Sequence, residues 1–279
     1  MDSLVTTAWL AEHLDDPDLR ILDASFFLPQ HDRDASAEYA AEHIPGAVFL
    51  DLAYFADAES NLPSMVPSAE FAGQRLGELG VARDTRVVVY DDSPLHSAAR
   101  GWWLLRLFGA REVAILDGGL RKWRAEGRPV ALGIDTPEPR AFKAAPDPGM
   151  VRDMAAMTAN LDSGAEQVAD ARSPARFAGA EAEHRPNTEA GHIPGSRNVP
   201  YATLFNPDGT WKRGDTLARA FTDQGIDLDR PLVTTCGSGI TAAVLVFGAH
   251  LLGHDAALYD GSWAEWGATP AAPKATGAA

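Results

Sequence analysis

Cysteine is almost absent from this sequence, because Cys236 is the only one in 279 residues. One thiol cannot form a disulfide within the chain, which is typical of a reducing compartment, so we expect a cytoplasmic location. Long apolar runs are absent too: the longest apolar window, residues 240–252, spans about 13 residues and includes His250. A window this short cannot cross a bilayer, so we expect no membrane partner.

Positive charge is also scarce. Lys and Arg number 24 against 39 Asp and Glu, which gives a net charge of −15. This balance argues against a nucleic acid or an anionic membrane as partner. A small anionic substrate would need a local positive pocket within this negative envelope. Residues 1–14 have no basic stretch, so they predict a short helix rather than a signal peptide.

Motifs for bound metals and cofactors are missing as well. The histidines show no His-Glu-x-x-His or similar ligand spacing, and no Gly-x-Gly-x-x-Gly or Gly-Lys-Ser/Thr loop is present for a nucleotide. We therefore expect neither a catalytic metal nor a cofactor.

The two halves of the sequence resemble each other. Four blocks recur in the same order, at spacings between 143 residues, from Asp117 to Asp260, and 149 residues, from His43 to His192. The matched blocks are residues 21–25 with 168–172, 43–47 with 192–196, 86–91 with 231–236, and 116–119 with 259–262. Four blocks at nearly one spacing indicate a duplicated domain.

The duplication sets the expected domain boundaries. We expect one domain in residues 1–135 and a second in residues 150–270. Residues 136–149 contain four prolines and little periodicity, which is typical of a linker. We expect the tail, residues 271–279, to be disordered.

Strands alternate with helices in both halves. The expected strands are 20–25, 86–91 and 113–117, repeated as 167–172, 231–236 and 256–260, with helices at 97–108 and 240–252. This alternation predicts an α/β fold of two tandem domains, each with a mainly parallel sheet flanked by helices on both faces. In such sheets the functional crevice lies beyond the C-terminal strand ends, which is where Cys236 lies.

The most informative stretch is the turn at Cys236. A short β-branched strand breaks at Cys236-Gly237-Ser238-Gly239, and a helix resumes near Ile240. Two glycines let the backbone curl so that several N–H groups and the helix N-terminus point at one sulfur, which favours a thiolate. A lone cysteine is more often a small buried hydrophobe. Such a residue has no need of glycines at two of the next three positions, so we favour a reactive thiol.

The first half has Asp91 at the position of Cys236. A carboxylate cannot act as a soft nucleophile toward sulfur, and an aspartate at a strand end is typically a turn or cap residue. We therefore expect the first half to be a non-catalytic copy.

A known family shares these features. The tandem halves, the two His-Ile-Pro-Gly turns and the loop at residues 236–241, Cys-Gly-Ser-Gly-Ile-Thr, resemble the two-domain rhodanese family of sulfurtransferases, and the loop is similar to its 3-mercaptopyruvate branch. The resemblance implies that Cys236 takes a sulfane sulfur from a small anionic donor, becomes a persulfide and passes the sulfur to a thiol or cyanide. Two alternatives stay open: thiosulfate as the donor, and a persulfide relay that serves a protein thiol.

The resemblance also assigns the other site residues. Arg176 and Arg185, nine residues apart before the second His-Ile-Pro-Gly turn, would bind the carboxylate and carbonyl of the donor, a task that suits the planar guanidinium fork. The alternative is a pair of solvated surface charges, the usual reading for one arginine alone; we favour the binding role, more for Arg176 than for Arg185. The N–H groups of the loop, from Gly237 through Gly239 and Ile240 to Thr241, would cradle the anionic sulfur. The Ser238 and Thr241 hydroxyls would add hydrogen bonds, or instead cap the helix.

The sequence departs from the branch at two positions. Many members carry an acidic residue and a histidine that activate the loop serine, and Ala53 and Ser64 stand there instead. The relay to Ser238 would be absent, or rebuilt with Asp51 or His96.

A cysteine phosphatase is a competing interpretation, because these enzymes also place a cysteine at a strand-loop-helix turn. They need an arginine six positions after the cysteine, and position 242 is alanine. The sequence therefore disfavours this reading.

Overall fold

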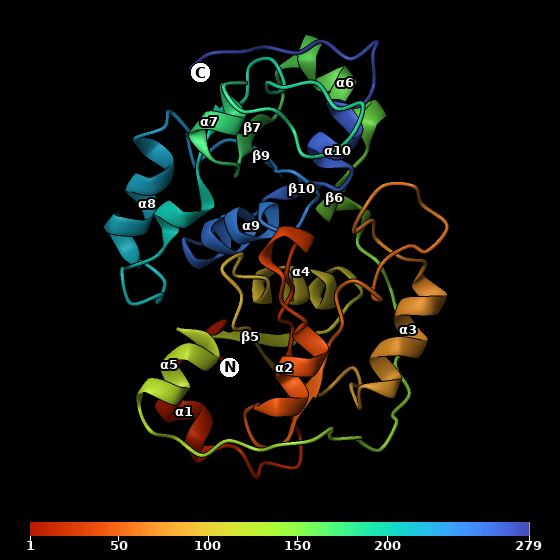
Figure 1. The fold of residues 1–279 in the computed structure, drawn as a ribbon, viewed down its shortest axis with the longest axis vertical. Helices are drawn as coiled ribbons and strands as arrows, with labels where there is room; N and C mark the ends of the chain where they lie inside the picture. The colour runs from red at the N-terminus through yellow and green to blue at the C-terminus, as the bar shows by residue number, and fades with distance from the viewer. Residues whose placement is uncertain (279) are drawn as a thin grey trace. The chain divides into compact units, whose positions relative to one another are not determined.

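The computed structural model describes residues 1–278. It divides into two compact units. Figure 1 colours the chain continuously from red at the N-terminus to blue at the C-terminus. The N unit comprises Met1–Ala58, Val66–Asp147 and Pro207–Trp211, and the C unit comprises Glu59–Met65, Pro148–Asn206 and the chain from Lys212 onward. The segment 207–211 is held in the N unit by a hydrogen bond of 2.9 Å from the Trp211 N–H to Asp117 Oδ1.

The N unit contains a five-stranded parallel sheet with strand order β1-β5-β4-β2-β3. Its strands are β1 (Leu4–Val5), β2 (Leu19–Asp23), β3 (Ala47–Phe49), β4 (Arg86–Tyr90) and β5 (Glu112–Leu116). Its helices are α1 (Thr7–Glu12), α2 (Ala35–Ala41), α3 (Ala69–Glu78), α4 (Ala98–Leu107) and α5 (Gly119–Ala125), with a 3₁₀ turn η1 at Pro29–His31. A hydrogen bond from the Thr7 hydroxyl to Glu126 joins α1 to the end of α5.

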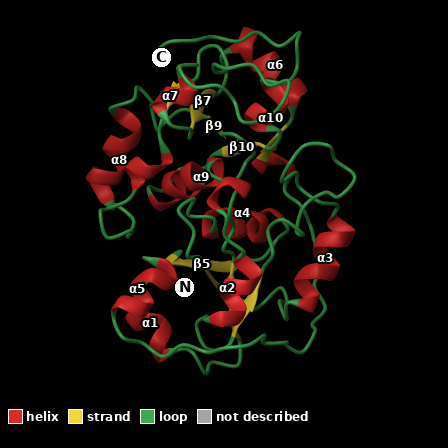
Figure 2. Cartoon of the chain, in the orientation of Figure 1, coloured by secondary structure: helices red, strands yellow, loops and turns green. Residues whose placement is uncertain are grey.

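The C unit repeats this plan, with the order β6-β10-β9-β7-β8 and all neighbours parallel. Its strands are β6 (Val151–Arg152), β7 (Gln167–Asp170), β8 (Arg197–Asn198), β9 (Leu232–Thr235) and β10 (Ala257–Tyr259). Its helices are α6 (Met154–Ser163), α7 (Pro174–Phe177), α8 (Gly214–Thr222), α9 (Ala242–Leu251) and α10 (Ser262–Trp266), with 3₁₀ turns η2 (Pro148–Met150) and η3 (Tyr201–Leu204). Figure 2 shows these short strands among helices and long loops. The expected α/β fold of two tandem domains is confirmed.

The central strands show why helices flank each sheet. All four residues of β9 are buried, as are the last four of β4, and consecutive strand residues point to opposite faces. Both faces of these strands must therefore be covered. Helix α9 is buried from Ala242 through Ala249, so it lies inside the C unit and fixes the end of the loop that follows β9. At ten residues, α9 is among the longest helices of the described chain, and none of them is long and apolar enough to cross a membrane.

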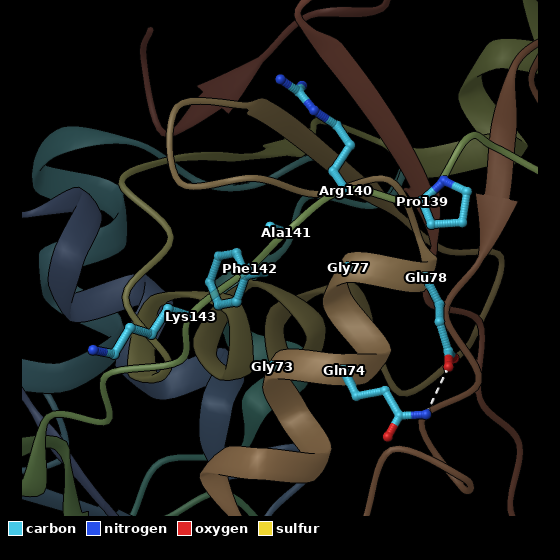
Figure 3. Close-up of a pocket in the computed structure, with 9 residues that line it drawn as sticks. All are labelled: Gly73, Gln74, Gly77, Glu78, Pro139, Arg140, Ala141, Phe142 and Lys143. Atoms are coloured by element: carbon cyan, nitrogen blue, oxygen red, sulfur yellow. Dashed lines mark hydrogen bonds between the residues drawn. The ribbon is translucent and has the colours of Figure 1, made fainter.

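The expected linker lies against the N unit. Residues 132–147 contain no helix or strand. Residues 140–144 run along α3, where the Arg140 N–H donates to the Gly77 carbonyl at 2.9 Å. A Cβ at Gly77 would stand 2.4 Å from the Arg140 carbonyl oxygen, so only glycine allows this approach. Figure 3 shows Phe142 and its neighbours across α3, where they line a shallow pocket.

The expectation of a disordered tail is wrong for the described residues 271–278; Ala279 lies outside them. Ala275 exchanges two backbone hydrogen bonds with His192, and the Trp266 indole N–H donates to the Pro273 carbonyl at 2.8 Å. Gly191 permits this pairing, because a Cβ there would lie 2.4 Å from the Ala275 carbonyl oxygen.

Candidate active site

Cys236 lies directly after β9, in the loop that leads into α9. Its side chain is 2 % exposed, and the Gly239 N–H donates to its Sγ at 3.1 Å. Gly239 has φ +80°, a conformation that a residue with a side chain adopts at a cost. The glycine at this position is therefore what turns an amide donor toward the sulfur.

Helix α10 holds the other side of the loop. The Trp263 N–H donates to the Cys236 carbonyl at 2.9 Å, and the Ala264 N–H donates to the Gly237 carbonyl at 3.0 Å. The Cys236 N–H donates in turn to the Ser262 hydroxyl at 3.3 Å. A trans peptide directs its N–H away from its C=O, so the N–H groups of Gly237 and Ser238 point away from α10.

Several donors of the loop remain available. Within the described chain, the N–H groups of Gly237, Ser238, Ile240 and Thr241 have no hydrogen-bond acceptor, and neither do the hydroxyls of Ser238 and Thr241. Thr241 is the N-cap residue of α9, but its side chain makes no capping bond. The capping interpretation of the Thr241 hydroxyl is therefore wrong. These groups are free to bind a sulfur or an oxygen of a ligand.

Arg176 and Arg185 both reach the loop. A Cβ built on Gly237 would lie 3.5 Å from Arg176 Nη2 and 3.7 Å from Arg185 Nη1. Arg185 Nη1 also donates to the Gly237 carbonyl at 3.4 Å. The structure thus places both guanidinium groups on the residue next to Cys236, so they are not separate surface charges.

Three further residues complete this cluster, and the sequence reasoning missed them. Glu183 Oε1 accepts from Arg172 Nη1 at 2.9 Å, and its Oε2 accepts from Arg176 Nη2 at 2.5 Å. Arg172 also donates to Asp170 at 2.7 Å. One signal was available: the repeat places serine at position 25, where the second half has Arg172, so this cation belongs to the second half alone.

Charges at the site affect one another. Burial, then repulsion by Arg176, lowers the pKa of Arg185, while a Cys236 thiolate and Glu183 act against that shift. Burial raises the pKa of Tyr201, and the thiolate adds to that effect. Arg185 has no ion pair within the described residues, so its charge is available to an anion.

The N unit keeps the cradle but fills it with a carboxylate. Asp91 Oδ2 accepts from the Ala98 N–H, the first residue of α4, at 2.5 Å, and Oδ1 accepts from the Ser93 N–H at 3.2 Å. These two bonds are typical of a turn or cap residue, which is the role expected for Asp91. Burial raises the pKa of Asp91 to about 7, although both N–H donors act to lower it.

We expect this carboxyl to make stability depend on pH. Its pKa in the folded state exceeds the ordinary value, so the folded state is favoured while Asp91 is neutral and loses that advantage as pH rises through about 7. Between about pH 5 and pH 8, the free energy of unfolding of wild type should fall by about 1–3 kcal/mol more than that of Asp91→Asn. Urea unfolding at the two pH values measures this, and equal slopes would contradict it.

Of the residues considered for a relay, Asp51 has a local role. Asp51 Oδ1 accepts from the N–H groups of Ala53 and Tyr54, so this carboxylate caps a turn. Burial lowers the pKa of His96 to about 4. Ser64, at φ +60°, belongs to the segment that groups with the C unit. A relay to Ser238 through Asp51 or His96 stays a prediction.

The sequence matches a family model in both halves. The rhodanese-like domain model covers residues 6–126 and 153–269. The chain belongs to the rhodanese family. Its two rhodanese-like domains lie one in each unit, apart from the short segments that the units exchange.

The curated relatives of this chain are named for two different sulfur donors. It is 42% identical over 271 residues to the human 3-mercaptopyruvate sulfurtransferase, covering 95% of this chain and 91% of that one. It is 41% identical over 272 residues to the rat thiosulfate sulfurtransferase, with the same coverage. The crystal structure of SseA from Escherichia coli, a 3-mercaptopyruvate sulfotransferase with the rhodanese fold, matches at a TM-score of 0.86 with 39% identity, covering 95% of this chain and all of that one.

Proposed function

We propose that this protein is a sulfurtransferase that moves a sulfane sulfur from 3-mercaptopyruvate, through a persulfide on Cys236, to a thiol or to cyanide. One observation carries the proposal: a thiol at a helix N-terminus receives the Gly239 N–H, lies among unpaired loop donors and adjoins two guanidinium groups. Cys236 is then the nucleophile, and Ser238 serves the reaction as a hydroxyl donor. Relatives with this activity, alike over most of the chain, support it.

The chemistry balances without a cofactor. The Cys236 thiolate attacks the donor's thiol sulfur, the new S–S bond forms, and the C–S bond breaks with its electron pair left on carbon. The resulting pyruvate enolate takes a proton, which yields pyruvate. An acceptor thiolate then attacks the outer sulfur of the persulfide, and the Cys236 thiolate leaves.

The loop donors suit both stages. The free N–H groups of Gly237, Ile240 and Thr241 can hold the outer sulfur, which carries negative charge when deprotonated. Arg185, with no carboxylate partner among the described residues, holds the donor's carboxylate, and Arg176 holds its carbonyl side.

Thiosulfate remains the second candidate donor, because the rat thiosulfate sulfurtransferase is nearly as similar. The loop itself carries no cationic side chain between Gly237 and Thr241, so a sulfonate has only Arg176 and Arg185 to bind. We place the reaction in the cytoplasm, where a single reactive thiol is kept reduced. We assign it to the second domain, residues 150–270, with residues 1–135 as the non-catalytic copy.

We expect wild-type kcat/KM to be higher for 3-mercaptopyruvate than for thiosulfate. Arg185→Ala should lower kcat/KM for 3-mercaptopyruvate by about 10–100-fold, because a charge-assisted hydrogen bond contributes about 1.5–3 kcal/mol. Initial rates with both donors, at a fixed concentration of a small thiol, measure both effects. The exposed Arg230→Ala is the matched control and should change neither donor's rate.

Three outcomes would count against the proposal. A wild type that prefers thiosulfate would overturn the donor assignment, and full activity in Arg185→Ala would overturn the role of that guanidinium. If small thiols and cyanide accept sulfur poorly while a protein thiol accepts it quickly, the relay alternative is correct instead.

A further inference from the structure

Glu183 is the buried carboxylate that holds the cationic cluster together. Its side chain is 1 % exposed, and its two oxygens accept from two different guanidinium groups, those of Arg172 and Arg176. Arg172 is fixed independently by Asp170, by the Gly191 carbonyl at 2.7 Å and by the Trp263 ring at 4.5 Å. Glu183 is therefore a neutralising bridge between a rigid arginine and the arginine that reaches Gly237.

The formal charges of the arginines and carboxylates in this cluster sum to +1. Asp170 balances Arg172, and Glu183 balances Arg176, while Arg185 has no carboxylate within the described chain. The arginines and carboxylates at Gly237 thus present two guanidinium groups but a net charge of only +1, and the Cys236 thiolate of the proposed mechanism brings the site to about zero. Without Glu183 the same two groups would present +2.

A low net charge at the site discriminates between anions. The cost of taking an ion out of water rises with about the square of its charge, whereas its attraction to a fixed positive charge rises in proportion to it. A site whose net charge is this low therefore compensates a monoanion better than a dianion. 3-Mercaptopyruvate brings one carboxylate, whereas thiosulfate brings two negative charges.

We infer that Glu183 sets donor selectivity: by neutralising Arg176 it restricts the site to donors with one negative charge and disfavours dianions such as thiosulfate. Glu183 touches no reacting atom, so it is a positioning and charge-setting residue. This inference rests on the proposed sulfurtransferase function.

The test is the ratio of kcat/KM for thiosulfate to kcat/KM for 3-mercaptopyruvate. In Glu183→Gln, which keeps the size of the side chain and removes its charge, this ratio should rise by about 10-fold, the change that one unit of charge next to a partly buried anion produces. Glu183→Asp retains the charge, so the ratio should stay at the wild-type value even if both rates fall. Glu181→Gln, exposed and two residues away, is the matched surface control.

Failure of the proposed function and failure of the inference about Glu183 give different results. A wild type that turns over neither donor refutes the proposed function itself. A Glu183→Gln variant that keeps activity with an unchanged or lower ratio refutes this inference alone, because a purely structural role would lower both rates together.

Wild type alone provides a second measurement if Glu183→Gln fails to fold. Methanesulfonate and sulfate have similar shape and size but carry one and two negative charges. Methanesulfonate should compete with 3-mercaptopyruvate more strongly than sulfate does. Equal or stronger inhibition by sulfate would overturn the inference.

Discussion

Sulfur transfer from 3-mercaptopyruvate should fall by about 10³-fold or more when Cys236 is replaced by serine, which is the scale of loss when a covalent nucleophile is removed. An alkoxide is far harder to form than a thiolate, and oxygen can neither hold a sulfane sulfur nor leave as readily. Serine is close in size to cysteine, and its hydroxyl can still accept the Gly239 N–H that now reaches Sγ. The loop should therefore persist while the chemistry stops.

Steady-state rates and intact-protein mass together check this result. After exposure to the donor without acceptor, wild type should gain the mass of one sulfur atom and lose it when cyanide is added, and Cys236→Ser should gain nothing. Asp91→Asn, at the equivalent position of the N unit, is the matched control and should keep turnover within about 3-fold, the scale of a substitution that touches no reacting group. Retained turnover in Cys236→Ser would refute the persulfide mechanism.

The fold could be predicted from the sequence because its signals are local and occur twice. The apolar run at 86–91 corresponds to β4 (Arg86–Tyr90), and the run at 231–236 corresponds to β9 (Leu232–Thr235). The edge strands β1 and β6 could not be predicted, since two residues each are too few to show any alternation. They form only because β5 and β10 offer them a parallel edge.

The loop of the site was predictable for the same reason, and the buried cluster was not. Cys236, Gly237 and Gly239 are neighbours in sequence, so their spacing alone suggests a turn that aims donors at sulfur. The bridge from Arg172 through Glu183 to Arg176 depends instead on how the segment after α7 folds back. Nothing in the spacing of charged residues distinguishes Glu183, which is buried, from Glu181, which is exposed.

The ordered tail shows the same limit. Its small residues are typical of disorder, and the reason for their order lies far away, in the absence of a side chain at Gly191 and in the backbone of His192. Only the tertiary structure brings these groups to residues 273–277.

Arg172→Met should destabilise the protein by about 3–5 kcal/mol, the cost of removing one partner from a buried ion pair. Arg172 is 1 % exposed, and its loss leaves the carboxylates of Asp170 and Glu183 buried without their shared cation. It also removes the stacking of the guanidinium on Trp263. Methionine fills much of the space of the arginine stem, so the deficit should reflect charge more than volume.

The pH dependence of this deficit distinguishes charge from packing. An uncompensated buried carboxylate favours its neutral form, so acid relieves the cost: the deficit should be smaller at about pH 5 than at about pH 8.

Arg152→Met is the matched control, because Arg152 makes a similar pair with Glu166 at 2.7 Å in the same unit but with both side chains at least 20% exposed. Exposed pairs contribute about 0–1 kcal/mol, so urea unfolding of this variant should stay near wild type. If Arg172→Met and Arg152→Met cost the same, or if the Arg172→Met deficit does not change with pH, the cluster is held by packing, and the charge balance assigned to Glu183 loses its basis.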